Sequence, residues 1–337
     1  MFKLLKLILL FISLFFIQSS FSTEKIASEH SVFSTLAENS LLLQSDRQET
    51  LTVVVGERGH ILYSLDNKNW QHASVETRQT LTNVFMLNKN TGWALGHDAV
   101  IVKTNDGAKT WQKVFSDVDE QAPLLDLYFK DDVNGIVIGA YGLVYVTEDG
   151  GKTWNKNELN IAGENDNAAN REAVFTDIYD IHLNDIAFAG NKRFYIAAES
   201  GHVLRSDDDA KSWTDLNLPY QGSFFGVLPL SFNKVLAYGL RGHLYLSSDA
   251  GITWEKIETG STEMLTDGLM LADGSVLISG LAGTLLISTD EGKSFKALNL
   301  EHRHGLTSIV ETKDRSILLT SDVGVELFSK EKLLSKE

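Results

Sequence analysis

A short motif returns six times along this chain of 337 residues, and it constrains the possible folds more than any other feature of the sequence. Its most complete copy is Thr147-Glu-Asp149-Gly-Gly-Lys-Thr-Trp154. A turn of small residues precedes each copy, and a seventh such turn follows the last copy. The second small residue of these turns advances by 40, 43, 59, 41, 41 and 41 positions. A period near 41 residues is typical of a repeat architecture in which each repeat is one supersecondary unit.

Each repeat holds four short apolar runs separated by turn residues. In residues 81–115 the runs are 4–7 residues long, rich in β-branched and aromatic side chains, and bounded by Gly, Asn and Asp. This pattern predicts a four-stranded antiparallel meander. Helical periodicity is not sustained anywhere after the N-terminal segment. Four-stranded units repeated around a ring form a β-propeller, so we predict an all-β, seven-bladed β-propeller.

The repeated motif, called the Asp-box below, has a mechanical interpretation. A carboxylate at its third position can accept backbone N–H groups within a tight turn, and the closing aromatic residue can fill the space between neighbouring sheets. A catalytic group is needed once, whereas a turn lock is needed in every blade, so we expect a structural role for all of them. The aspartates are Asp66, Asp106, Asp149, Asp208, Asp249 and Asp290, and the closing aromatic residues are Trp70, Trp111, Trp154, Trp213, Trp254 and Phe295.

The seventh repeat, Leu306 to Phe328, contains no Asp-box and lacks a fourth strand of its own. A segment within residues 28–37, including Val32 to Leu36, precedes the first complete repeat. We therefore predict that this segment closes the ring as the fourth strand of the last blade, which would remove an exposed sheet edge.

The N-terminus reads as an export signal. Lys3 and Lys6 precede an apolar stretch from Leu7 to Ile17, and small residues follow near Ser22. This predicts a signal peptide at 1–22, a single propeller domain at 23–337 and a periplasmic location. The chain has no cysteine, which excludes a lipid anchor and thiolate metal sites, and a core of this size needs no disulfides.

The formal net charge of −15 argues against nucleic acid and anionic lipid as partners. We expect no nucleic-acid binding, no direct membrane insertion, no cofactor and no bound metal, and a chain that is monomeric by itself.

Alternation of strands places the small-residue turns and the connections between blades on one face of the propeller, called the mouth face below. The interior residues of these turns vary while their framework is constant, which is typical of a scaffold that carries function on its loops. The candidate partner-binding residues are Arg58, Tyr141, Arg241, Glu57 and Glu199. The one long period contains an insertion at 157–179 on the same face, and a loop of this length is often functional.

Two further sets of polar residues occupy equivalent positions in several blades. One set, near the start of the innermost strands, either caps neighbouring backbone or forms a ring that binds a cation or a basic partner residue. It comprises Asn83, Asp126, Asp185 and Asp267. The other set is His60, His202 and His243. Because these histidines come from different blades, they are not expected to converge on one metal.

Residues of the third repeat resemble a known family. Asp126-Leu-Tyr-Phe129, Asn134 to Gly139 and Gly142 to Trp154 look like the repeat of the photosystem II stability/assembly factor family. The resemblance covers residues 40–329 and implies a seven-bladed propeller that is a non-enzymatic assembly factor of the lumen or periplasm. It also implies a partner in a periplasmic or inner-membrane protein complex, and for some non-photosynthetic members an RND-type exporter. Arg58 and Arg241 match the arginine of the family's Gly-x-Arg-Gly turn, whereas Tyr141, Ser200 and Ala282 replace it.

An enzymatic alternative is a sialidase-like or other glycoside hydrolase, since such enzymes also carry Asp-boxes. By resemblance, that site needs three arginines, a Tyr/Glu pair and an acid, and Arg58, Arg241, Tyr141, Glu57 and Glu199 can share one face. The sequence has no Arg-Ile-Pro signature before the first repeat, and it has seven minimal blades where six are expected. The non-catalytic binding propeller is therefore the favoured hypothesis.

Overall fold

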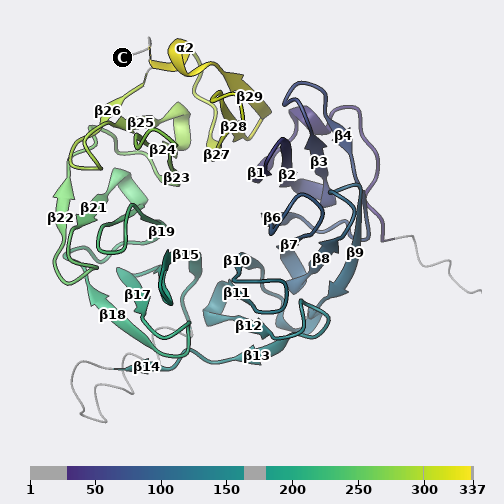
Figure 1. Cartoon of the computed structure of the whole chain (residues 1–337), viewed down its shortest axis with the longest axis horizontal. Coiled ribbons are helices and arrows are strands. Elements are labelled where there is room, and N and C mark those ends of the chain that lie inside the picture. Colours follow the sequence, from purple (N-terminus) through teal and green to yellow (C-terminus); the bar gives the residue numbers. More distant parts are fainter. Residues whose placement is uncertain (1–28, 163–179, 299, 335–337) are drawn as a thin grey trace, which may run out of the picture.

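The computed structural model describes residues 29–162, 180–298 and 300–334, and these residues form a ring of seven β-sheets around a central channel axis (Figure 1). Each sheet is one blade, and its strands follow one another from the axis to the outer edge. The prediction of an all-β, seven-bladed propeller of antiparallel blades is confirmed.

The strands of the first three blades are β1 (Leu42–Gln48), β2 (Leu51–Gly56), β3 (Ile61–Ser64) and β4 (Gln71–His72); β6 (Leu81–Met86), β7 (Gly92–Gly96), β8 (Ile101–Thr104) and β9 (Thr110–Phe115); β10 (Leu124–Phe129), β11 (Gly135–Gly139), β12 (Val144–Thr147) and β13 (Asn155–Asn157). Those of blades four and five are β15 (Leu183–Gly190), β16 (Arg193–Ala198), β17 (His202–Ser206) and β18 (Trp213–Asn217); β19 (Phe224–Pro229), β20 (Val235–Gly239), β21 (Leu244–Ser247) and β22 (Glu255–Ile257). Those of the last two blades are β23 (Leu265–Met270), β24 (Val276–Gly280), β25 (Leu285–Ser288) and β26 (Lys296–Ala297); β27 (Leu306–Glu311), β28 (Ile317–Ser321) and β29 (Gly324–Phe328).

Short helices occupy the turns and the two ends of the described chain. They are η1 (Ala37–Asn39), η2 (Glu57–Gly59), η3 (His97–Ala99), η4 (Val118–Glu120), η5 (Ala140–Gly142), η6 (Leu240–Gly242), η7 (Leu281–Gly283) and α2 (Lys330–Leu334). Among the described residues, no helix is both long enough and apolar enough to cross a membrane.

The core lies between the blades. The second strand of a blade is covered on both sides, and every residue of β2 is buried. Such strands are therefore continuous apolar runs such as Leu51-Thr-Val-Val-Val rather than alternating ones. Trp111, which closes an Asp-box, is fully buried in the cluster shared by blades one and two. Burial of apolar area at about 25 cal/mol per Å² between adjacent blades is the main force that holds the ring together.

Two blades gain a short parallel strand at the outer edge. β5 (Ser74–Val75) pairs with β9, and β14 (Ile161–Ala162) pairs with β18. Both belong to connections that leave one blade and run along the next. β14 is the first part of the predicted insertion, and Leu159 and Ile161 within it are buried. Residues 163–179 of that insertion lie outside the described residues, as does the predicted signal peptide 1–22.

The prediction that residues 28–37 complete the last blade is wrong. In the part of the chain that the structure describes, the last sheet contains β27, β28 and β29 alone, and residues 29–36 form no strand. This segment instead passes the outer edges of blades two and one. Ser31 donates its N–H to the carbonyl of Val75 at 2.8 Å, and the Arg78 side chain donates to the carbonyl of His30 at 2.9 Å. The rings of Phe33 and His72 lie with their centroids 5.5 Å apart.

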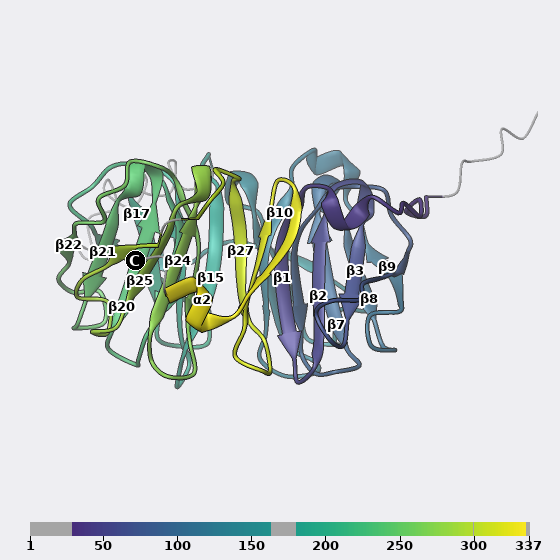
Figure 2. The ribbon, with the colours of Figure 1, turned by 90° about the horizontal axis from the view of Figure 1, so that it is seen from above.

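The reason lies in the path by which the chain enters β1. η1 crosses the mouth end of β29 in close contact. The two backbones lie so near each other that a Cβ atom added to Gly324 would be 1.9 Å from the Glu38 carbonyl oxygen. From there the preceding residues continue outward over blade one and do not return along β29 (Figure 2). The ring itself closes between β27 and β1, where the Ser45 and Ser308 hydroxyls lie 2.7 Å apart and Thr307 donates to the Leu42 carbonyl.

Candidate functional site

The mouth face is formed by tight turns that share one backbone geometry. In six of the seven turns the middle residue is left-handed, with φ between 54° and 58°, although none of the six is glycine or asparagine. These residues are Arg58, Asp98, Tyr141, Ser200, Arg241 and Ala282. A side chain in this region of backbone space strains the chain, by about 1 kcal/mol or more for residues other than glycine.

Arg58 and Arg241 lie in blades one and five, on well-separated parts of the ring (Figure 1). Both are exposed, and the Arg58 side chain retains 79% of its accessible surface. Its guanidinium lies 3.9 Å from the carboxylate of the adjacent Glu57, which is too loose and too exposed a pair to hold it in one position. The two arginines therefore form two separate positive points on the mouth face and do not form one small pocket.

Tyr141 and Glu199 come from neighbouring blades and meet through a third residue. The Tyr141 ring, which is 57% exposed, packs edge-on against the His182 ring with centroids 5.2 Å apart. Glu199 accepts the backbone N–H of His182 at 3.0 Å, and its carboxylate lies 3.7 Å from His182 Nδ1. These three residues form one amphipathic patch at the junction of blades three and four.

His182 was not a candidate from the sequence. It stands just after the long insertion, where the repeat register is interrupted, and no equivalent histidine marks the other blades. The one available signal was its place next to the inner strand of blade four, on the face that also carries Glu199.

The polar set on the innermost strands ties adjacent blades together. Asp126, Asp185 and Asp267 each accept a backbone N–H from the next blade at 2.7 Å, donated by Ile186, Val227 and Ile309. Asn83 donates its amide to Asp126 at 2.6 Å. This geometry is the capping arrangement, one of the two alternatives that the sequence left open.

These carboxyl groups are displaced from their ordinary acidity. Loss of hydration raises the pKa of Asp267, whereas the hydrogen bonds from the backbone of Ile309 and Gly268 lower it. The loss of hydration is the larger effect, and the pKa is raised to about 7. Loss of hydration also raises the pKa of Asp126 well above its ordinary value, and the charge of Asp185 raises it further. Asp267 is therefore partly protonated near neutral pH.

The three equivalent histidines do not converge. His60 Nδ1 lies 3.0 Å from His72 Nε2, His202 Nδ1 lies 2.7 Å from a carboxylate oxygen of Asp215, and the His243 ring packs on Tyr220. Each histidine is engaged within its own blade or with the adjoining connection, which agrees with the expectation that they do not share a metal.

The Asp-box turns occupy the opposite face. In blade three, Asp149 accepts the N–H groups of Lys152 and Thr153 at 2.9 Å and the hydroxyls of Thr147 and Thr153 at 2.9 and 2.7 Å. These bonds lower the pKa of Asp149 to about 2. Each of the six Asp-box aspartates accepts hydrogen bonds from groups of its own turn, and a carboxylate held in this way has no free geometry for acid–base chemistry.

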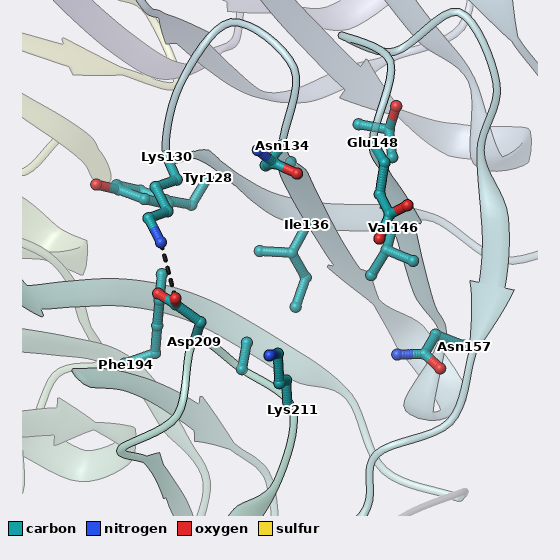
Figure 3. Close-up of a pocket in the computed structure, with 13 residues that line it drawn as sticks. Tyr128, Lys130, Asn134, Ile136, Val146, Glu148, Asn157, Phe194, Asp209 and Lys211 are labelled. Atoms are coloured by element: carbon teal, nitrogen blue, oxygen red, sulfur yellow. Dashed lines mark hydrogen bonds and ion pairs between the residues drawn. The ribbon is translucent and has the colours of Figure 1, made fainter. Parts of the chain in front are cut away.

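A cavity of about 360 Å³ opens on this Asp-box face between blades three and four (Figure 3). Ile136 and Val146 line its floor, Phe194 lines its wall, and an ion pair of 2.7 Å between Lys130 and Asp209 lies at its edge. In blade two the positions of Ile136 and Val146 hold Trp93 and Lys103, and Lys103 donates to the Gly150 carbonyl of the next Asp-box at 2.7 Å. The cavity thus exists because smaller residues replace an aromatic–cation pair.

Comparison with known families identifies one match. The sequence model described as "Photosynthesis system II assembly factor YCF48" matches residues 62–160 and 114–268, which together span more than half of the chain. In the comparison with curated protein sequences, none matches this chain.

Solved structures share the fold at low sequence identity. YCF48 from Cyanidioschyzon merolae superposes with a TM-score of 0.68 at 15% identity, over 90% of this chain and 99% of that one. A YCF48 bound to a D1 peptide superposes with a TM-score of 0.66 at 15% identity, over 89% and 96%. The extracellular domain of a putative hybrid two-component system from B. thetaiotaomicron gives 0.66 at 11% identity, over 89% of this chain and 42% of that one.

Proposed function

The chain belongs to the family of the photosynthesis system II assembly factor YCF48, and we propose that it is a non-catalytic binding propeller whose mouth face docks on another protein. We further propose that the chain is exported to the periplasm, and that its partner is a periplasmic or inner-membrane complex, with an RND-type exporter as one candidate. The signal-peptide pattern of residues 1–22 supports export, and the similar extracellular domains are consistent with it.

The variable residues of the mouth-face turns carry this proposal. Six of these turns share one backbone geometry, whereas the side chain at their middle position differs from blade to blade. A constant framework with variable exposed residues is typical of a scaffold that carries binding function on its loops. Arg58, Tyr141 and Arg241 are exposed, and arginine and tyrosine are the residue types that most often anchor protein interfaces. Glu57, Glu199 and the insertion 157–179 complete the proposed contact surface.

A relative supports the mode of binding. A YCF48 structure holds a D1 peptide, so a propeller of this family can bind a segment of another protein. The separation of Arg58 from Arg241 also fits an extended partner better than a small substrate, since a sugar carboxylate would need its arginines in one pocket.

The experiment is a charge reversal on one face with a matched control on the other. A tagged chain is purified from solubilised membranes as wild type, as Arg58→Glu/Arg241→Glu, and as Lys152→Glu/Lys293→Glu. The last pair lies exposed in Asp-box turns and changes the net charge equally. We expect the mouth variant to lose its co-purifying partner and the control to retain it, with unchanged thermal unfolding for both.

The opposite outcomes are distinct. Retention of the partner by the mouth variant, or equal loss in both variants, would contradict docking by the mouth face. Release of sugar from a sialoside by the wild-type protein would favour the hydrolase alternative.

A further inference from the structure

Two histidines and a carboxylate meet where blade six joins blade seven. His302 and His304 lie on the connection that leads into β27, and Glu326 lies on β29. His302 Nε2 is 2.9 Å from one carboxylate oxygen of Glu326, and His304 Nδ1 is 3.4 Å from the other. The two imidazole rings are stacked with centroids 4.1 Å apart. Three donor atoms of the kinds that bind transition metals are thus within 4.8 Å of one another.

Glu326 is an exception to the pattern of the repeat. It pairs with Leu319 of β28 and faces the preceding blade, as its counterparts do. In the other six blades the residue paired at this point is apolar or aromatic and at most 4% exposed. These residues are Leu62, Val102, Tyr145, Leu204, Tyr245 and Leu286. A carboxylate at a core position needs a compensating partner, and both histidines point at it.

The distances suit a metal ion. Zn²⁺ binds imidazole nitrogen and carboxylate oxygen at 2.0–2.2 Å, so neighbouring ligand atoms of a tetrahedral site stand about 3.3 Å apart. His302 Nε2 lies 2.9 Å from Oε2 of Glu326 and His304 Nδ1 lies 3.4 Å from its Oε1, so each nitrogen has one carboxylate oxygen near this distance. All three side chains are partly exposed, between 21% and 40%, so an ion has a route in from solvent.

We propose that His302, His304 and Glu326 bind one divalent transition-metal ion of the Zn²⁺ class. The three residues supply three ligands, and an adjacent cavity of about 340 Å³, lined by Glu301, Glu326 and Lys332 among others, leaves a fourth position for water or a partner's ligand. The ion joins β29, which has no fourth strand beside it among the described residues, to the connection from blade six.

Binding has a defined proton cost. His302 Nδ1 accepts the backbone N–H of His304 at 3.3 Å, which places the proton of the neutral ring on Nε2, the nitrogen that faces Glu326. Coordination through Nε2 moves that proton to Nδ1 and gives up this long hydrogen bond.

The test is titration of the metal-free chain with ZnCl₂ by isothermal calorimetry at pH 7.5. We expect one Zn²⁺ per chain and a rise in the thermal midpoint on binding. Glu326→Leu, which installs the residue of blade six, and His302→Gln should each weaken binding at least tenfold.

The control is His72→Gln, which removes one member of the His60–His72 pair and should leave the titration unchanged. Thermal unfolding of the metal-free variants checks that each is folded, and Glu326→Gln replaces Glu326→Leu if the latter does not fold. An absence of Zn²⁺ binding by the wild type, or binding that survives both the His302 and the Glu326 substitutions, would overturn the proposal.

Discussion

In each Asp-box one aspartate carboxylate accepts several hydrogen bonds from its own turn. Asp106 accepts the N–H groups of Lys109 and Thr110 at 3.1 and 3.0 Å and the hydroxyls of Thr104 and Thr110 at 3.0 and 2.6 Å. Loss of hydration opposes its ionisation, but the hydrogen bonds from Thr110 and Thr104 outweigh this, and the pKa of Asp106 lies below its ordinary value. Its contribution to stability is therefore present at neutral pH and is lost as the pH falls through that lowered pKa.

Two substitutions in this Asp-box distinguish the stability that the turn contributes from the stability that the buried tryptophan contributes. Trp111 is fully buried, and Trp111→Ala should lower the free energy of unfolding by about 3–5 kcal/mol, since a large cavity remains between blades one and two. Asp106→Ala should lower the free energy of unfolding by less, because the exposed N–H and hydroxyl groups of the turn can form hydrogen bonds with water instead. Urea unfolding followed by tryptophan fluorescence measures both. An Asp106→Ala variant that equalled Trp111→Ala in cost would contradict this division of roles.

Asp267 makes the opposite contribution to pH dependence. Because its folded pKa is raised to about 7, stability is greatest when it is protonated and is lost as the pH rises from about 4 to about 7. Asp267→Ser installs the residue found at the equivalent position of blade seven, Ser308. Between pH 4 and pH 8 the variant should lose about 2 kcal/mol less stability than the wild type, a value reduced from the full shift because Asp267 is only half-buried.

Thermal unfolding of both proteins across this pH range measures the difference. Parallel pH profiles for wild type and Asp267→Ser would show that folding does not raise the pKa of the Asp267 carboxyl, and would contradict this account.

At the scale of single elements, the last blade is the least regular. Its three strands leave β29 at the edge, and α2 follows directly after it. Leu333 of this short helix is 1% exposed and belongs to the apolar cluster between blades six and seven. The helix thus supplies part of the burial that a fourth strand provides elsewhere.

Leu333→Ala tests this role of α2. Loss of a buried leucine side chain should lower the free energy of unfolding by about 2–4 kcal/mol, although the residue lies four positions before the last residue of the sequence. Lys332→Ala on the same helix is the control and should change stability by less than about 1 kcal/mol. Equal and small effects of both substitutions would mean that α2 contributes little to the stability of the ring.

What the sequence could predict depended on whether the signal was local. The blades were predictable because a turn such as Asn105-Asp-Gly107 and a wedge such as Trp111 specify a hairpin within a few residues. The path of residues 29–36 was not, because an apolar stretch does not say which edge it meets. Val32, Phe33 and Leu36 are in fact 58–71% exposed.

The candidate site was predictable in part for the same reason. The turn positions of Arg58, Tyr141 and Arg241 followed from the repeat register. The contact between Tyr141 and His182 joins two blades across a register interruption, and the approach of His302 and His304 to Glu326 depends on the register of β29. Such contacts between distant positions appear only in three dimensions.

At the scale of the whole molecule, the two faces of the ring differ in character. The Asp-box face consists of turns whose polar groups form hydrogen bonds with one another, whereas the mouth face carries exposed arginine and tyrosine side chains. The central claim of the proposed function is that only the mouth face touches the partner.

Site-specific photo-crosslinking tests this claim most directly. A photoreactive phenylalanine analogue is placed at Tyr141 on the mouth face or at Ile252 on the Asp-box face, positions that are 57% and 74% exposed. After irradiation in intact cells, the chain labelled at position 141 should form a discrete adduct with a membrane-complex protein that disappears in the Arg58→Glu/Arg241→Glu background. The chain labelled at position 252 should form none. The same adduct from position 252, or an adduct from position 141 that persists in the charge-reversed background, would contradict docking by the mouth face.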